Sequence, residues 1–448
     1  MRDPMVIDRN EALKRFRRGR RRSRELFGLI PDASYFDRPI ALRNPICFYD
    51  GHLPAFSVNT FWKRAMGERG IDADFEKLFE RGIDPEEEAQ AGGSASAWPS
   101  RSAIGEYGRE ADARIEEAIL SRPLEDEGNP LLERGQALFT ILEHEVMHQE
   151  TLHYMWRRIP YGRKAARNGN PAPLSGPEKA PSNPWVRVPS GTATLGAEQG
   201  RFAWDNELPR HAVEVPSFEM SMHDVSNEEF RKFVEAGGYE CEELWDAEGW
   251  SWVKSAEVTH PPFWIPGAKA GEFQWLGMFE RIPLPAAWPA WVTQAEASAY
   301  ARWKGGGARL PTEAEYDRAA YGNPSGAARE FPWGDEPPDG SRGNFDFRHW
   351  EPVAAGSYPA GASAWGIHDL VGNGWEWTST VFEGFPGFAP MASYPQYSAD
   401  FFDGKHYVMK GASPVTGRDL VRRSFRNWFR PAYPHVYASF HLVWDAGR

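Results

Sequence analysis

The first 160 residues have the hydrophobic periodicity of amphipathic helices. Between residues 10 and 29, the apolar side chains Leu13, Phe16 and Leu26 recur among many arginines. Further segments with a helical pattern and few helix-breaking residues are 51–67, 109–120 and 133–158. Amphipathic helices bury their apolar stripes best against one another. The sequence therefore predicts a helical bundle at residues 1–160.

The pattern changes after Trp185 to short alternating strands, such as 186–188 and 211–215, which glycine and proline interrupt. Short helices are predicted after Ser226 and after Thr293. Residues 160–184 contain six prolines and almost no apolar side chains, a composition typical of linkers. We expect an α+β protein with a bundle at 1–160, a Pro/Gly-rich linker at 161–184 and a loop-rich second domain at 185–448.

Composition and charge narrow the function classes. The chain has 448 residues with 51 Lys and Arg against 63 Asp and Glu, a net charge of −12. An acidic chain binds nucleic-acid phosphates poorly, and no apolar run is long enough to cross a membrane. Only Cys47 and Cys241 are present, which excludes a disulfide framework or a cysteine zinc site. We expect a cytoplasmic protein that binds neither nucleic acid nor membranes.

The strongest helical segment contains His144 and His148 in the sequence EHEVMH. Residues four apart lie about 40° from each other around a helix, so both imidazoles can hold one metal ion. Three interpretations compete. The pair faces solvent or fills the bundle interior, or it forms a zinc-protease HExxH motif with Glu145 as general base, or a third histidine completes an open metal site. Against the second, Thr151 and Tyr154 stand where the extended protease motif needs Gly and His.

His52 is the best candidate for the third histidine. It lies in the apolar stretch 48–56, where an isolated polar ring needs a partner, and Gly51 beside it allows close approach of another element. A site of three imidazoles suits iron or zinc, and the spacing alone does not choose between them.

Two motifs mark the second half of the chain. RLPTEAEY at 309–316 predicts a strand followed by a helix, which Thr312 caps and Glu315 completes as a capping box. GNGWEWT at 372–378 predicts a strand with one buried face. Both patterns indicate structure rather than catalysis.

Together with GHLPAF around His52 and EHEVMHQETLHYM at 143–155, these motifs resemble the hercynine-dependent sulfoxide synthases of ergothioneine biosynthesis. The resemblance spans nearly the whole chain apart from the linker. It implies a DinB-like helical bundle followed by a C-type-lectin-like domain of the formylglycine-generating-enzyme (sulfatase-modifying factor) type. It also implies that His52, His144 and His148 bind Fe(II), with O2 as oxidant, near the imidazole C2 of hercynine. The second fold alone hosts several chemistries, so the histidines carry the functional expectation.

The same resemblance assigns substrate contacts. Asn427 and Trp428 match hercynine-binding positions, where the aromatic face suits the quaternary ammonium and the amide suits the carboxylate; alternatively, Trp428 is one more packed tryptophan among 20. The catalytic tyrosine is expected near Met391 or Tyr394, so Tyr394 is the candidate and Met391 marks a lost proton donor. Arg101 matches a donor-binding arginine, or it is a surface residue at a helix start.

The donor itself is predicted from departures from the family pattern. Synthases that use γ-glutamylcysteine carry an acid directly after the RNW triplet, whereas Phe429 stands there, and Met147 occupies a position that is polar in some of them. The sequences at 51–67 and 391–414 are similar to those of the selenoneine synthases, in which a selenosugar is the donor. A neutral sugar needs no counter-ion at Phe429, and a selenolate is a soft ligand for iron.

We therefore expect a selenoneine synthase that buries hercynine at the domain boundary. The alternative is an ergothioneine-type sulfoxide synthase with a thiol donor such as cysteine or γ-glutamylcysteine. More remote alternatives are an HExxH zinc hydrolase and a non-catalytic lectin-like protein.

Overall fold

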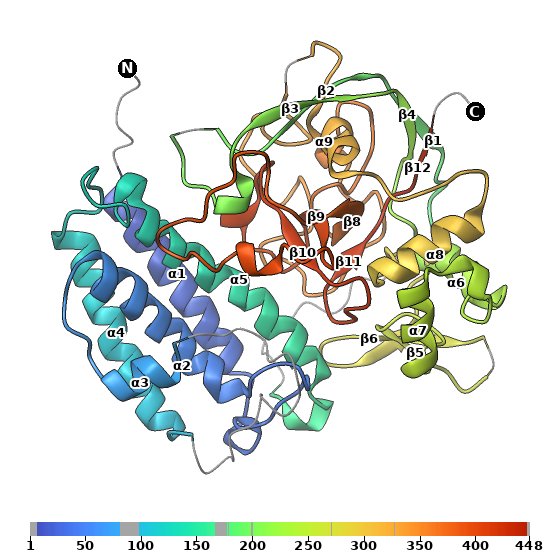
Figure 1. Ribbon diagram of the computed structural model, residues 1–448. Coiled ribbons are helices and arrows are strands. Elements are labelled where there is room, and N and C mark those ends of the chain that lie inside the picture. The colour runs from blue at the N-terminus through green and yellow to red at the C-terminus, as the bar shows by residue number, and fades with distance from the viewer. Residues whose placement is uncertain are drawn as a thin grey trace. The chain divides into compact units, whose positions relative to one another are not determined.

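The computed structural model describes residues 7–80, 98–165, 177, 179–198, 200–269, 271–326 and 328–445 (Figure 1). The chain forms two compact units. The first contains Met1–Asn170, Gln199–Trp204 and Pro390–Tyr397, and the second contains Pro171–Glu198, Asp205–Ala389 and Ser398–Arg448. Half of the predicted linker, residues 166–176 and 178, lies outside the described residues.

The first unit is a helical bundle. Helix α1 packs against α4 and α5, and α2 packs against α4 (Figure 1). The predicted apolar positions Leu13, Phe16 and Leu26 of α1 are buried, as the amphipathic pattern requires. The helices of this unit are α1 (Arg9–Phe27), α2 (Ile46–Ser57), the π-helix η2 (Val58–Ala65), α3 (Ala73–Leu78), α4 (Arg101–Ser121) and α5 (Gln136–Arg158).

The second unit is built on small sheets joined by long loops. Its central sheet has the strand order β10-β9-β8-β11, in which β11 runs parallel to β8 and the other pairs are antiparallel. The remaining sheets have the orders β1-β4-β12, β2-β3 and β5-β6-β7. The strands are β1 (Trp185–Val188), β2 (Gly191–Leu195), β3 (His211–Val215), β4 (Phe218–Ser221), β5 (Trp264–Pro266), β6 (Phe273–Leu276), β7 (Arg281–Pro283), β8 (Gly374–Val381), β9 (Tyr407–Ala412), β10 (Asn427–Phe429), β11 (Ala438–Ser439) and β12 (Val443–Asp445).

Tryptophans fill the core of this unit. Trp291 and Trp377 are fully buried, and their indole N–H groups donate to backbone carbonyls of Asn373 (3.0 Å) and Val292 (2.9 Å). A buried indole needs such an acceptor, which the long loops supply without regular strand pairing.

The predicted helix starts are confirmed by their caps. Ser226, Thr293 and Thr312 each form a capping box with the glutamate three residues later. The helices of the second unit are α6 (Asn227–Glu235), α7 (Ala247–Ser255), α8 (Gln294–Lys304) and α9 (Glu313–Tyr321), of which α7 was not predicted.

Two local predictions need correction. The predicted strand before Pro311 is reduced to a single bridge between Arg309 and Val443. Strand β8 is buried on both faces from Gly374 to Thr378, because Glu376 points into a polar cluster of the interior rather than to solvent. Along the described ranges, none of the helices combines the length and hydrophobicity needed to cross a membrane.

Candidate metal centre

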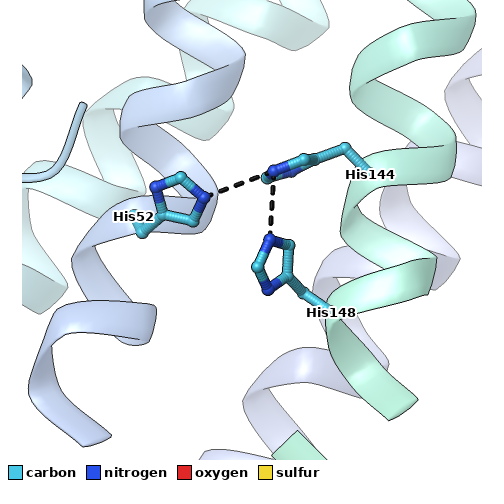
Figure 2. A group of neighbouring side chains, drawn as sticks. All are labelled: His52, His144 and His148. Atoms are coloured by element: carbon cyan, nitrogen blue, oxygen red, sulfur yellow. Dashed lines mark hydrogen bonds between the residues drawn. The ribbon is translucent and has the colours of Figure 1, made fainter. Parts of the chain in front are cut away.

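Three histidine side chains of the first unit converge on one point (Figure 2). His52 comes from α2, and His144 and His148 come from successive turns of α5. The Nε2 atom of His144 lies 3.3 Å from Nε2 of His52 and 3.1 Å from Nε2 of His148. The structure thus brings together the two histidines of α5 and His52, the residue that the sequence indicated as their third partner.

The distances fit a common metal ion. With metal–imidazole bonds of roughly 2.0–2.1 Å, neighbouring ligand nitrogens lie about 2.9–3.4 Å apart. The Nδ1 atom of His52 is 2.8 Å from the carbonyl oxygen of Phe79, so this nitrogen donates its proton there and Nε2 keeps its lone pair for a metal.

Burial keeps the three rings neutral. It lowers the pKa of His52 to about 4, and it lowers the pKa of His144 and of His148 well below the usual range. The neighbouring imidazoles add to the effect, because protonating one ring would place a positive charge against the others. His148 is partly exposed as a residue, but its Nδ1 is fully enclosed. Neutral imidazoles are the form that binds metal, so protons do not compete with a metal at pH 7.

Aromatic side chains fix the orientation of the rings. Phe56, one turn after His52 on α2, stacks on His144 with ring centroids 3.5 Å apart and planes 7° apart. Phe48, one turn before His52, stacks on His52 at 5.2 Å and 16°. An all-imidazole set held in this way suits iron or zinc and leaves coordination positions for other ligands.

Glu145 faces away from this centre. Both of its carboxylate oxygens accept hydrogen bonds from the guanidinium of Arg20 on α1, at 3.0 and 3.2 Å, and one also accepts from the hydroxyl of Ser23. A general base must reach the water at the metal, whereas this carboxylate is buried in an ion pair. The zinc-hydrolase interpretation of HEVMH is therefore wrong for this chain.

Tyr394 lies beside the centre, on the segment Pro390–Tyr397 that belongs to the first unit. Its ring centroid is 5.3 Å from that of Phe56 and 6.4 Å from that of His144. Met391, the other candidate position for the catalytic group, is buried in the same segment.

Met147 is in contact with Tyr397. Its sulfur lies 3.2 Å from the hydroxyl of Tyr397, which donates to it. The only sequence signal for Tyr397 is its spacing of three residues from Tyr394. Phe56 and the Phe79 carbonyl were missed as well, because neither residue carries a signal of its own.

Arg101 begins α4 and ties this helix to the end of α1. Its guanidinium donates to the carbonyls of Ile30 (2.7 Å) and Phe27 (2.9 Å) and to the carboxylate of Asp32 (2.8 Å). It also lies 4.8 Å from the ring centroid of Tyr35. The side chain thus has a structural task, and its contact with a donor stays a prediction.

Strand β10 of the second unit consists of three predicted substrate contacts. Asn427 and Trp428 belong to the RNW motif, and Phe429 directly follows it. The side-chain oxygen of Asn427 accepts from the backbone N–H of Trp428 (2.9 Å), and the Trp428 ring stacks on Phe382 at 4.2 Å and 7°. The ring of Phe429 stacks on Tyr433 at 4.7 Å and 16°. All three side chains of the β10 strand are half-buried.

Comparisons with known proteins agree with this architecture. The DinB superfamily model matches residues 15–152, and the model of the sulfatase-modifying factor enzyme 1-like domain matches residues 171–446. The predicted α+β fold, a DinB-like bundle followed by a formylglycine-generating-enzyme-like domain, is thereby confirmed.

Curated relatives are similar to this chain over much of its length. A hercynine oxygenase of Mycolicibacterium smegmatis is 36% identical over 68% of this chain and 71% of its own length. A hercynine oxygenase of Mycolicibacterium thermoresistibile is 38% identical over 69% of this chain and 68% of its own. An ergothioneine biosynthesis protein 1 of Neurospora crassa is 27% identical over 93% of this chain and 56% of its own.

The fold and the histidine centre define a two-domain enzyme in which a helical bundle precedes a sulfatase-modifying-factor domain. The chain belongs to the family of such enzymes that contains the hercynine oxygenases.

Proposed function

We propose that this chain is an Fe(II)- and O2-dependent enzyme that joins a chalcogen atom of a donor to C2 of the hercynine imidazole. The observation that carries the proposal is the cluster of three neutral imidazoles from α2 and α5, with Nε2 atoms 3.1 and 3.3 Å apart. Hercynine as substrate is supported by the names of the relatives, which are hercynine oxygenases.

His52, His144 and His148 would hold the iron, which when bound supplies activation of O2 and of the donor's sulfur or selenium. The chain contributes a fixed, neutral ligand set, because the Phe79 carbonyl and the Phe48 and Phe56 rings restrain the imidazoles. Tyr394 beside His144 is the proposed catalytic proton donor, since a phenol carries one proton that it can give or share.

For a thiol donor the reaction balances with one O2. The S–H bond of the donor and the C2–H bond of hercynine break, and a C–S bond forms. The sulfur is oxidised to a sulfoxide with one oxygen atom, and the other oxygen leaves as water with the two hydrogens. No external reductant is needed.

A thiol such as cysteine or γ-glutamylcysteine is the first candidate donor, because the relatives are named for hercynine oxygenation and ergothioneine biosynthesis. A selenosugar is the second candidate, which would make the chain a selenoneine synthase. The observation that favours it is the Phe429 ring stacked on Tyr433, which offers no charge to the ammonium group of an amino-acid donor. Arg101, Met147 and Met391 are further proposed donor contacts, and Asn427 and Trp428 are the proposed hercynine contacts.

The proposal is tested by loading the full chain with Fe(II) without air and then adding air, hercynine and either a thiol or a selenosugar. Mass spectrometry should detect hercynine with a new C–S or C–Se bond, and the preferred donor decides between the two candidates. His52→Ala should abolish the product, whereas His260→Ala, a half-buried histidine of the second unit, should leave it unchanged. Iron-independent turnover, or full turnover by His52→Ala, would contradict the proposal.

A further inference from the structure

The segment Pro390–Tyr397 is held on the bundle by a small group of polar contacts. The backbone N–H of Ser393 donates to the side-chain oxygen of Gln136 (3.0 Å), and the Ser393 hydroxyl lies 2.8 Å from the hydroxyl of Thr140. The guanidinium of Arg64 donates to the carbonyls of Ala392 (3.1 Å) and Ser393 (3.2 Å). Ser393 is 1% exposed and Thr140 is 0% exposed, so water does not compete for the bond between their hydroxyls.

A second anchor holds the other end of the segment. The hydroxyl of Tyr397 donates to the sulfur of Met147 (3.2 Å), and its ring stacks on Trp204 with centroids 4.0 Å apart. The indole N–H of Trp204 donates to the carboxylate of Glu143 (2.8 Å), which fixes the ring against which Tyr397 packs. Trp204 lies on Gln199–Trp204, the other segment of the later sequence that joins the first unit.

All four α5 residues in these anchors lie on one stripe of the helix. Gln136, Thr140, Glu143 and Met147 follow the spacing i, i+4, i+7, i+11, which places them on a common face. The stripe that carries His144 and His148 is offset by one residue, about 100° around the helix. One helix therefore presents the histidines and holds the segment that carries Tyr394.

Tyr394 lies between the two anchors, one residue after Ser393 and three before Tyr397. We propose that Thr140 and Gln136 are positioning residues, which hold Ser393 and thereby fix the Tyr394 phenol beside His144. The inference rests on the proposed function in so far as Tyr394 acts in the reaction. Restricting the phenol to one place replaces a conformational search by a fixed geometry, an effect that is large in intramolecular reactions.

The test compares Thr140→Val, which removes the hydroxyl at constant shape, with Thr140→Ser, which keeps it. We expect Thr140→Val to lower kcat about 10-fold or more, with KM for hercynine changed less than about twofold, and Thr140→Ser to restore most of kcat. In a Tyr394→Phe background, Thr140→Val should have almost no further effect, because a positioning residue acts through the group that it positions. Effects that multiply in the double variant would overturn the proposal.

Two readouts need neither turnover nor metal. Hydrogen exchange of the peptide containing Ser393 should be about 10-fold faster in Gln136→Met, which removes the acceptor of the Ser393 N–H. The same is expected in Thr140→Val, which removes the hydroxyl contact that holds Ser393 in place. Fluorine NMR of 3-fluorotyrosine at position 394 should shift toward the free amino acid in the same variants. If hercynine were not the substrate, these measurements would still decide whether the anchor fixes Tyr394.

Thr151→Val is the matched control, since it makes the same change on the same helix at a hydroxyl that accepts from Tyr154 (3.4 Å). It should leave the exchange and the fluorine signal of the segment unchanged. Unchanged exchange and an unchanged signal in both Thr140→Val and Gln136→Met would overturn the proposal. Gln136→Met also keeps the test valid should Thr140→Val fail to fold.

Discussion

His52 shows how one residue is prepared for metal binding by its surroundings. Its Nδ1 is committed to the Phe79 carbonyl, its ring is stacked on Phe48, and it is 1% exposed. An isolated buried imidazole with one free nitrogen would be destabilising, since that lone pair has lost its water. The nearby nitrogens of His144 and His148 make a metal ion the natural partner.

The lowered pKa values predict the pH dependence of metal binding. At an exposed histidine, protons compete with a metal ion for the imidazole nitrogen near pH 6.5, whereas burial lowers the pKa of His52 to about 4 and those of His144 and His148 well below the usual range. Affinity for Fe(II) or Co(II) should therefore stay level from pH 8 down to about 6 and fall only at more acid pH. Anaerobic titration at several pH values checks this. A steep loss of affinity between pH 7 and 6 would contradict it.

At the scale of elements, helix α2 depends on Gly51 for its contact with the end of α3. A Cβ atom at Gly51 would lie 2.5 Å from ring atoms of Phe79, the C-cap residue of α3. The absence of a side chain thus lets Phe79 lie against α2, where its carbonyl reaches His52. The close packing of α2 against Phe79 therefore also orients the His52 imidazole.

Gly51→Ala should displace Phe79 and weaken metal binding roughly 10- to 100-fold, the usual effect of losing a hydrogen bond behind a ligand. The control is Gly105→Ala on α4, where the nearest atom to an added Cβ is the flexible Arg109 guanidinium at 3.5 Å. That variant should bind metal normally and be slightly more stable, because alanine favours helix. Metal affinity equal in the two variants would contradict this account of Gly51.

The sequence predicted the elements whose signals are local. Helical periodicity, the His144–His148 spacing and the caps at Ser226, Thr293 and Thr312 depend on neighbouring residues, and the structure has each of them. What the sequence did not predict depends on contacts distant in the chain. The two-sided burial of β8, the return of Pro390–Tyr397 to the bundle and the Phe79 carbonyl leave no periodic pattern to detect.

At the scale of the whole molecule, each unit contains its own buried group of titratable side chains. In the second unit, the carboxylate of Glu376 lies 2.9 Å from Nδ1 of His441, and Asp224 is within 3.6 Å of the same nitrogen. All three are at most 1% exposed. Burial is the largest cause that raises the pKa of Glu376 to about 7 and that of Asp369 to about 7, and it also raises that of Asp224.

These carboxyls make stability depend on pH. Glu376 holds its proton up to about pH 7 when folded but releases it near its ordinary 4.5 when unfolded. The folded state therefore binds more protons between these values, and this contribution to the free energy of unfolding falls as the pH rises toward 7. Glu376→Gln mimics the protonated acid, so its stability relative to the original protein should increase from pH 4.5 to 7 and then stay level.

The gain should be on the order of 3 kcal/mol, and urea denaturation across this pH range measures it. Comparing the two proteins at each pH cancels the contribution of titratable groups that do not interact with Glu376. Glu272→Gln, an exposed change of the same kind, should show no such trend. If Glu376→Gln were less stable than the original protein by the same amount at every pH, Glu376 would not be protonated in the folded protein.

The first unit is assembled from three parts of the chain, since Gln199–Trp204 and Pro390–Tyr397 pack with the bundle. The candidate metal ligands all come from the N-terminal part, whereas Tyr394 comes from the later sequence. We therefore expect His52, His144 and His148 to bind one iron ion.

X-ray absorption of the Fe(II)-loaded full chain, combined with metal analysis, tests whether these three histidines bind the iron. We predict one iron per chain with three imidazole nitrogens in its first shell, and loss of one imidazole with weakened iron retention in His52→Ala. An unchanged first shell and full iron content in His52→Ala would contradict the account.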